Sequence, residues 1–274
     1  MLTRTLAPLA AAVLLTGACD LDTGSRAESR MAVDESVATG QADAAQQTIV
    51  EISTSFTLGD AVEQALADIE AFVRSQAACT TVTRTGDRGL RIDFGALADA
   101  CEYRGRTYAG VITIELDPAD ADGAAVVHHT AEAFTNGVVT LDGTADVTWT
   151  RESRRVVSDL EFVREARTTA VQSDRTQRLL DPGAGLAGGI TVDGDRTWQN
   201  DRGEFALTIE DVELRPADPV PQAGTYRLTV PSGNTVTMTF TRLDDDTIEV
   251  RIDGQRRDLV FHVTRAGAVD EQDA

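Results

Sequence analysis

Apolar and polar residues alternate along most of the chain beyond residue 80. Leu90, Ile92 and Phe94, for example, would share one face of an extended segment, whereas the residues between them are charged. This period of two is typical of a β-strand with one buried face. Residues 80–84 are rich in β-branched side chains, and residues 86–89 supply glycines for a tight turn. We therefore predict a β-hairpin here.

The clearest alternation lies in residues 222–264, where four alternating segments are separated by turn-forming residues. It predicts a four-stranded antiparallel meander with one buried face. Residues 216–221 contain three prolines, which lack an amide donor and fix φ, so this stretch marks a boundary. Because four short strands form only a small core, we expect the meander to pack on the preceding sheet. Residues 110–116 predict a further strand.

A similar pattern occurs twice in the middle of the chain. Residues 137–143 precede Trp149, and residues 189–194 precede Trp198. Each copy has the form of a strand, an Asp-Gly turn and a second strand that carries the tryptophan. We interpret the two tryptophans as packing residues, with ligand-stacking platforms as the alternative.

Only one segment has a convincing helical pattern. Val62, Leu66, Ile69 and Val73 recur at spacings of four, three and four, which predicts an amphipathic helix over residues 60–77. We expect its apolar stripe to pack on the sheet.

Together these patterns predict a mainly β protein. Its antiparallel sheets would form a sandwich or a curved open sheet, with one N-terminal amphipathic helix. Residues 46–215 would form a helix plus antiparallel β domain that begins with a strand at residues 48–55, and residues 222–264 the meander packed on it. Residues 19–45 are rich in Asp, Ala, Ser and Gln and lack an apolar face, which is typical of a flexible linker. Residues 265–274 are expected to be a disordered tail.

The chain has three cysteines, Cys19, Cys79 and Cys101. Cys79 lies at the open end of the predicted hairpin, and Cys101 follows its second strand closely enough to return to it. A disulfide between them would close a loop of about 20 residues and stabilise the fold by roughly 3 kcal/mol. Two buried free thiols are the alternative. A bridged pair would indicate an oxidising compartment.

The N-terminus has the layout of an export signal. Residues 1–18 carry Arg4, then an apolar run too short to span a bilayer, then small residues before Cys19, as in a secretory signal peptide. Residues 15–19, LTGAC, resemble the lipobox of bacterial lipoproteins, although Thr16 stands where that family usually has a large aliphatic residue. The resemblance implies that Cys19 is the lipidated first residue of the mature protein. It also implies an anchor on an envelope membrane, at the periplasmic face or the outer membrane.

The body of the chain is similar to uncharacterised bacterial lipoproteins. The similarity rests on the pattern IDFG, then Cys101, then GR and a later Gly, within residues 92–110. It implies no particular activity.

Charge narrows the range of partners. The formal net charge is −20, and all 25 basic residues are Arg. Because an acidic surface repels phosphate backbones, nucleic acid is excluded as an expected partner. The membrane, through the lipid anchor, is the one partner that the sequence indicates.

Candidate chemistry is sparse. His128 and His129 are adjacent and would point to opposite faces of a strand, and His262 lies on the polar face of another, so no zinc site or other cofactor is predicted. No nucleophile elbow or phosphate-binding loop is present in the sequence. Asp clusters within residues 117–122 and 244–246 could bind Ca²⁺, but turns capped by their own Asp side chains are the favoured interpretation.

The leading functional hypothesis is a non-catalytic, lipid-anchored envelope protein with a binding or structural role. One alternative is a carrier of apolar cargo, in which large residues would surround an unfilled volume, namely Trp149, Phe162, Trp198 and Phe205. Another is a polysaccharide hydrolase, which would need a cleft with two opposed carboxylates whose pKa values are pushed apart.

Overall fold

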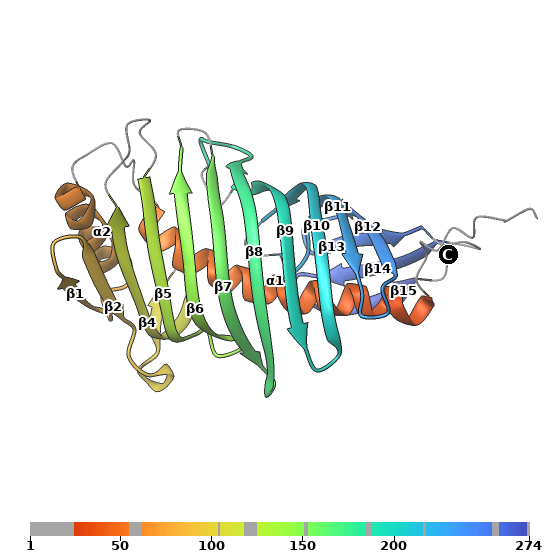
Figure 1. Cartoon of the computed structure of the whole chain (residues 1–274), viewed down its shortest axis with the longest axis horizontal. Coiled ribbons are helices and arrows are strands. Elements are labelled where there is room, and N and C mark those ends of the chain that lie inside the picture. Colours follow the sequence, from red (N-terminus) through yellow and green to blue (C-terminus); the bar gives the residue numbers. More distant parts are fainter. Residues whose placement is uncertain are drawn as a thin grey trace, which may run out of the picture.

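The computed structural model describes residues 25–54, 62–103, 105–117, 125–150, 153–184, 188–215, 218–253 and 258–272. It confirms a mainly β fold, in which one large open antiparallel sheet is accompanied by helices (Figure 1). The helices are α1 (Arg26–Thr54), α2 (Val62–Gln76) and the short 3-10 helix η1 (Leu97–Asp99). The strands are β1 (Thr81–Thr85), β2 (Gly89–Asp93), β3 (Cys101–Tyr103), β4 (Arg106–Asp117), β5 (Ala125–Thr135), β6 (Thr140–Trp149), β7 (Arg154–Arg164), β8 (Arg167–Leu179), β9 (Ile190–Asn200), β10 (Gly203–Leu214), β11 (Ala223–Thr229), β12 (Thr235–Arg242), β13 (Thr247–Ile252), β14 (Leu259–Thr264) and β15 (Val269–Gln272).

The sheet follows the chain almost without crossovers. Its order is β1-β2-β4 and then each strand in sequence to β15, with the short β3 paired to β4 off this path. Neighbouring strands are antiparallel throughout. The predicted hairpin at residues 80–94 is confirmed as β1 and β2, and the side chains of Leu90, Ile92 and Phe94 are buried as expected.

The predicted meander is confirmed as β11 to β14, but it does not pack face to face on a separate sheet. Leu207 of β10 pairs with Leu228 of β11, so the same sheet continues past the proline-rich boundary. The described prolines of that stretch lie in the connection between the two strands, where a missing amide costs no ladder hydrogen bond. The disordered tail is also wrong in part, because Val269 pairs with Val263 and β15 adds another strand.

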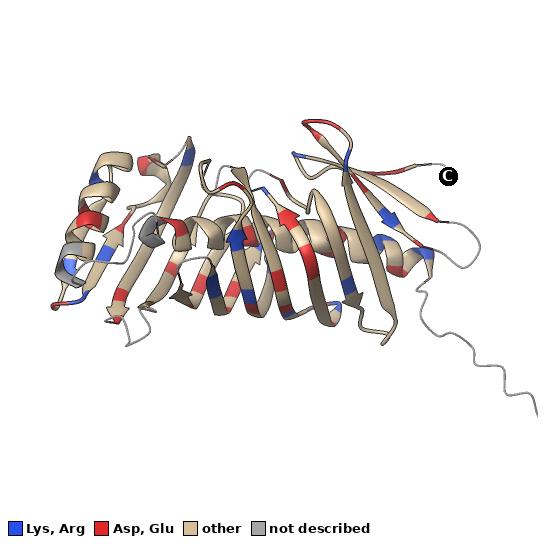
Figure 2. Ribbon diagram, turned by 90° about the horizontal axis from the view of Figure 1, so that it is seen from above, with Lys and Arg blue, Asp and Glu red and all other residues tan. Residues whose placement is uncertain are grey.

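The largest departure from the sequence prediction is α1. Residues 26–54 form one helix where a flexible linker and a first strand were expected. It runs along the length of the sheet and across its strands (Figures 1 and 2). Near its start Glu28 accepts a hydrogen bond of 3.0 Å from Asn234, which directly precedes β12, and near its end the hydroxyl of Thr48 lies 3.0 Å from that of Tyr108 in β4.

Burial of α1 extends around most of its circumference. Small and polar side chains such as Ser29, Thr39 and Gln46 are as buried as Ala32 and Ile49. The helix therefore has no single apolar stripe, which explains why the periodicity expected of a helix on a sheet is missing. Its Ala and Gln residues are nevertheless good helix formers. No described helix combines the length and the apolar character needed to cross a membrane.

The second helix matches its prediction. Leu66, Ile69 and Val73 of α2 are buried in the main core, and α2 contacts β1, β2 and α1. The predicted start at Asp60 lies outside the described residues. The inner face of the sheet completes this core with fully buried aromatic side chains, namely Phe94, Phe134, Phe205 and Phe261.

The repeated Asp-Gly pairs are not turns but parts of continuous strands. In β6 the carboxylate of Asp142 accepts a hydrogen bond of 2.7 Å from the amide of Ala133, which forms a bulge in β5 with φ 47°. In β9 Asp193 accepts the equivalent bond of 2.9 Å from the bulged amide of Asp211 in β10, which has φ 48°. Each Asp thus satisfies an amide that the bulge removes from the ladder. The repeat is a real structural motif, placed on either side of the β7 and β8 pair.

A glycine at the middle of α1 allows the closest approach of another segment. A Cβ atom on Gly40 would collide with the carbonyl oxygen of Pro219, in the connection between β10 and β11. We predict that Gly40→Ala lowers the free energy of unfolding by about 1 to 3 kcal/mol, because steric overlap outweighs the usual gain of about 1 kcal/mol in helix propensity.

Urea denaturation of the Gly40→Ala variant measures this difference. Ala38→Gly, at a partly exposed position of the same helix, is the control and should cost only the propensity of about 1 kcal/mol. A Gly40→Ala protein that is more stable than the wild type would contradict the contact.

Candidate functional site

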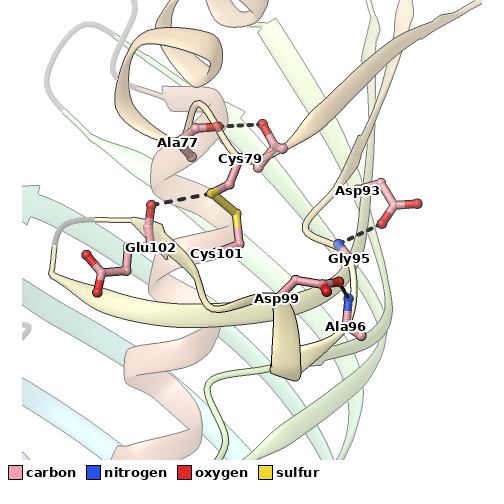
Figure 3. The surroundings of a disulfide bond; sticks show 9 residues. Ala77, Cys79, Asp93, Gly95, Ala96, Asp99, Cys101 and Glu102 are labelled. Carbon is pink, nitrogen blue, oxygen red and sulfur yellow. Dashed lines mark hydrogen bonds between the residues drawn. A yellow bond between two sulfur atoms is a disulfide. The ribbon is translucent and has the colours of Figure 1, made fainter.

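The predicted disulfide is present. Cys79 and Cys101 are bonded, with their Cα atoms 5.4 Å apart, and they tie the segment after α2 to the start of β3 (Figure 3). Nearby carboxylates cap the adjoining backbone, because Asp93 accepts from the amide of Gly95 and Asp99 from that of Ala96, each at 2.9 Å. The bridge is structural, and it leaves neither sulfur as a nucleophile. The predicted lipidation site, Cys19, lies outside the described residues.

The adjacent histidines do point to opposite faces. His128 lies between two carboxylates on the exposed face, with Nδ1 2.7 Å from Asp146 and Nε2 3.2 Å from Asp117. Hydrogen bonds first to Asp146 and then to Asp117 raise the pKa of His128. His129 is buried on the inner face, where its Nδ1 lies 3.1 Å from the carbonyl oxygen of Ala145, and burial lowers its pKa to about 4.

The turn at residues 244–246 is capped by its own Asp side chain, as predicted, whereas Asp120 and Asp122 of the other acidic cluster lie outside the described residues. Asp244 accepts hydrogen bonds of 2.8 Å from the amides of Asp246 and Thr247, as a capped turn should. Of the other predicted cluster, Asp117 pairs with Arg88 and His128. No group of three potential metal ligands occurs within the part of the chain that the structure describes.

Both tryptophans pack inward. Trp198 is buried and stacks on Phe205 with ring centroids 5.1 Å apart. Trp149 is partly buried against a small cluster that includes Val147 and Val156. The guanidinium of Arg154 lies 5.4 Å from its ring centroid. The packing interpretation is therefore confirmed for Trp198, and Trp149 also belongs to the interior rather than to an open platform.

A buried polar seam, which the sequence did not indicate, lies between α1 and the inner face of the sheet. At its centre Asp43 of α1 pairs with Arg175 of β8 at 3.1 Å and with Arg196 of β9. Arg175 also donates to the side chain of Gln46 at 2.8 Å. Both guanidinium groups are almost completely buried, and burial lowers the pKa of Arg175. The helix thus supplies the anion and the sheet the cations.

A second carboxylate of α1 repeats this arrangement two turns earlier. Glu35 is 3 % exposed and accepts hydrogen bonds from Trp198 at 3.2 Å, Asn200 at 3.0 Å and Arg202 at 3.1 Å. Arg167 adds an ion pair at 3.6 Å. Both carboxylate oxygens of Glu35 therefore have donors, which hold α1 against β8, β9 and the turn that follows β9.

On the other side of Arg175 the seam continues to Arg154 in β7. Its Nε donates to Gln177 at 2.6 Å, and Gln177 also accepts from Gln47 of α1 at 3.4 Å. Burial lowers the pKa of Arg154 to about 10, with a smaller contribution from the charge of Arg175. Three neighbouring strands therefore each place one arginine on the inner face.

A cavity of about 40 Å³ borders this seam. Such a space holds about three water molecules. Its wall includes α1 on one side, strand residues opposite, and the connection between β10 and β11, namely Gly40, Asp43, Ala44, Gln47, Arg175, Gln177, Ile190, Leu214, Arg215, Asp218, Pro219, Pro221 and Tyr226. The two carboxylates among them are both ion-paired, Asp43 as above and Asp218 with Arg242 and Arg265. They are not free to act as an acid and base pair.

Sequence reasoning missed this seam because it placed Asp43 in a flexible linker. One signal was present, since Arg175 stands two residues from Ser173 and four from Val171 and therefore shares their inward face. A charged residue on the buried face of a strand requires a buried partner.

Comparison of the chain with protein-family models, curated proteins and solved structures gives no match in any of the three.

We predict that Asp43→Ala lowers the free energy of unfolding by about 3 to 5 kcal/mol, because it leaves two buried guanidinium groups without their shared anion. Asp34→Ala is the matched control on the same helix. Asp34 forms an exposed pair with Arg30, which contributes roughly 0.5 kcal/mol or less. Equal losses in the two variants, measured by urea denaturation, would show that the seam does not hold α1.

The lowered pKa of His129 predicts a loss of stability in acid. His129 takes up a proton near pH 6.5 in the unfolded chain but only near pH 4 in the folded protein. The stability that depends on neutral His129 is therefore complete above pH 6.5 and is lost as the pH falls to 4. The loss amounts to roughly 3 kcal/mol. Unfolding curves from pH 7.5 to 4 measure it.

His129→Gln should flatten this pH dependence. The control is His128→Gln, because the raised pKa of His128 has the opposite sign: its contribution is present at low pH and is lost as the pH rises. If His129→Gln leaves the acid loss unchanged, other groups cause it.

Proposed function

We propose that the protein is a non-catalytic, lipid-anchored component of a bacterial cell envelope, with a binding or structural role. The anchor is the lipid on Cys19, which the LTGAC motif supports. The disulfide between Cys79 and Cys101 fits an exported protein, since such bonds persist in oxidising compartments.

The main support for a binding or structural role is the position of α1, which occupies the inner face of the sheet where a carrier would need an open volume. Residues that the carrier hypothesis needs around an open volume, such as Trp198 and Phe205, are buried inside a filled core. The cavity beside α1, about 40 Å³, is far below the several hundred Å³ of ordinary ligand pockets. A carrier of lipid chains would require α1 to leave, which would expose the buried carboxylates of Glu35 and Asp43 and their arginines.

A hydrolase is supported no better. Asp43 and Asp218 border the cavity, yet each is already held by two arginines. A general acid or base must reach the proton that it transfers to or from the substrate, whereas both of these carboxylates are occupied by arginine side chains. The surface that we propose for contact with other molecules is the outer face of the sheet, where acidic residues such as Asp159, Asp174 and Asp195 are exposed.

Metabolic labelling with a palmitate analogue tests the anchor. We expect the wild-type protein to carry the label and to sediment with membranes, and Cys19→Ser to lose both properties. The double variant Cys79→Ser/Cys101→Ser is the control and should keep the label. A labelled Cys19→Ser protein, or an unlabelled wild type, would exclude lipidation at this residue.

Mass spectrometry of lipid extracts distinguishes a covalently attached lipid anchor from a lipid that is bound as cargo. The soluble mature chain with Cys19→Ser should release no stoichiometric lipid. Recovery of about one lipid per chain would favour the carrier instead.

A further inference from the structure

The buried seam beside the α1 cavity carries an excess of positive charge. Arg175 and Arg196 share the single carboxylate of Asp43. Arg215 also lines the cavity but is exposed to solvent, and Asp218, on the same wall, is engaged by arginines of its own. This excess lies in a chain whose formal net charge is −20. A buried cation without a full counterion is costly, so the surplus requires an explanation.

Several donors of the same seam lack acceptors. The Nε atoms of Arg175 and Arg196 and the side-chain amide nitrogen of Gln46 are buried without a hydrogen-bond partner. Arg175 is 4 % exposed and directly lines the cavity. Buried donors are nearly always satisfied in folded proteins, by the protein, by water or by a ligand. Of these three residues only Arg175 lines the cavity, so an occupant would supply the acceptor that its Nε lacks, and an anion would suit this cation best.

The rest of the wall limits the size and shape of an occupant. Ile190, Leu214, Pro219 and Pro221 form apolar surface, while Gln177 and Tyr226 add polar side chains. An anion of this site therefore needs acceptor atoms at one end and a small apolar part at the other. A volume of about 40 Å³ suits an occupant of a few heavy atoms.

We propose that this cavity binds a small carboxylate anion, of the size of formate or acetate, with its oxygens toward Arg175 and its apolar side toward the prolines. A carboxylate matches the planar donor fork of a guanidinium group. It would also supply the negative charge that Asp43 alone does not provide. This site does not depend on the lipid anchor or on the role proposed for the outer face.

Thermal unfolding of the soluble mature chain tests the site. Acetate is titrated at constant ionic strength, which is maintained by a bulky sulfonate too large for the cavity. We expect a saturable rise of about 5 °C in Tm, as for a ligand present well above its Kd. No rise would overturn the proposal and leave the cavity to water.

Ala44→Leu fills the cavity, because Ala44 lines it, and should abolish the response to acetate. Ala38→Leu, on the same helix but not in the cavity wall, should respond as the wild type does. If acetate raised the Tm of Ala44→Leu as much as that of the wild type, the rise would be a general salt effect and the proposal would be wrong.

A measurement on the wild-type protein covers the case in which Ala44→Leu fails to fold. Saturation transfer by NMR from the protein to the methyl group of acetate should be detectable and should fall at least five-fold when formate is added in roughly tenfold excess. Transfer that formate does not reduce would show that acetate binds elsewhere.

Discussion

The apolar inner face of the sheet must be shielded from water by α1, and the buried ion pairs of α1 determine where the helix lies on that face. Asp43 and Glu35 each pair with arginines of the sheet strands, Asp43 with Arg175 and Arg196 and Glu35 with Arg167. Apolar contacts alone specify position weakly, because they have no direction, whereas a guanidinium and a carboxylate must meet in a defined geometry. The seam therefore fixes both the rotation of α1 and its position along the strands.

Most of the sheet could be predicted because alternation survives wherever one strand face is buried. The meander at residues 222–264 and the hairpin that begins near Thr81 are examples. The Asp-Gly pairs were misread as turns, since the same dipeptide serves a bulge on the neighbouring strand, as at Asp142 and Ala133. Strand pairing across the proline-rich stretch could not be seen, because the sequence does not distinguish a continuing sheet from a second one.

The candidate site was hidden for a different physical reason. A helix that is enclosed on most sides does not need the apolar stripe by which helices are recognised, and α1 has none. Asp43 therefore looked like part of a polar linker, and its partners Arg175 and Arg196 could not be identified. Where the chemistry was local, as in the bond between Cys79 and Cys101, the sequence sufficed. Where an interaction joins residues more than a hundred positions apart, as between Asp43 and its two arginines, the sequence did not reveal it.

The order of the elements has a consequence for how the protein reaches its folded state. α1 comes first, yet Asp43 meets partners 132 and 153 residues later, and Glu28 meets Asn234 after 206 residues. Contacts between such distant residues slow folding. A strongly apolar leading segment would be exposed to aggregation throughout that delay. The same polar surface that leaves α1 without a stripe keeps it compatible with water until the strands that enclose it have been made.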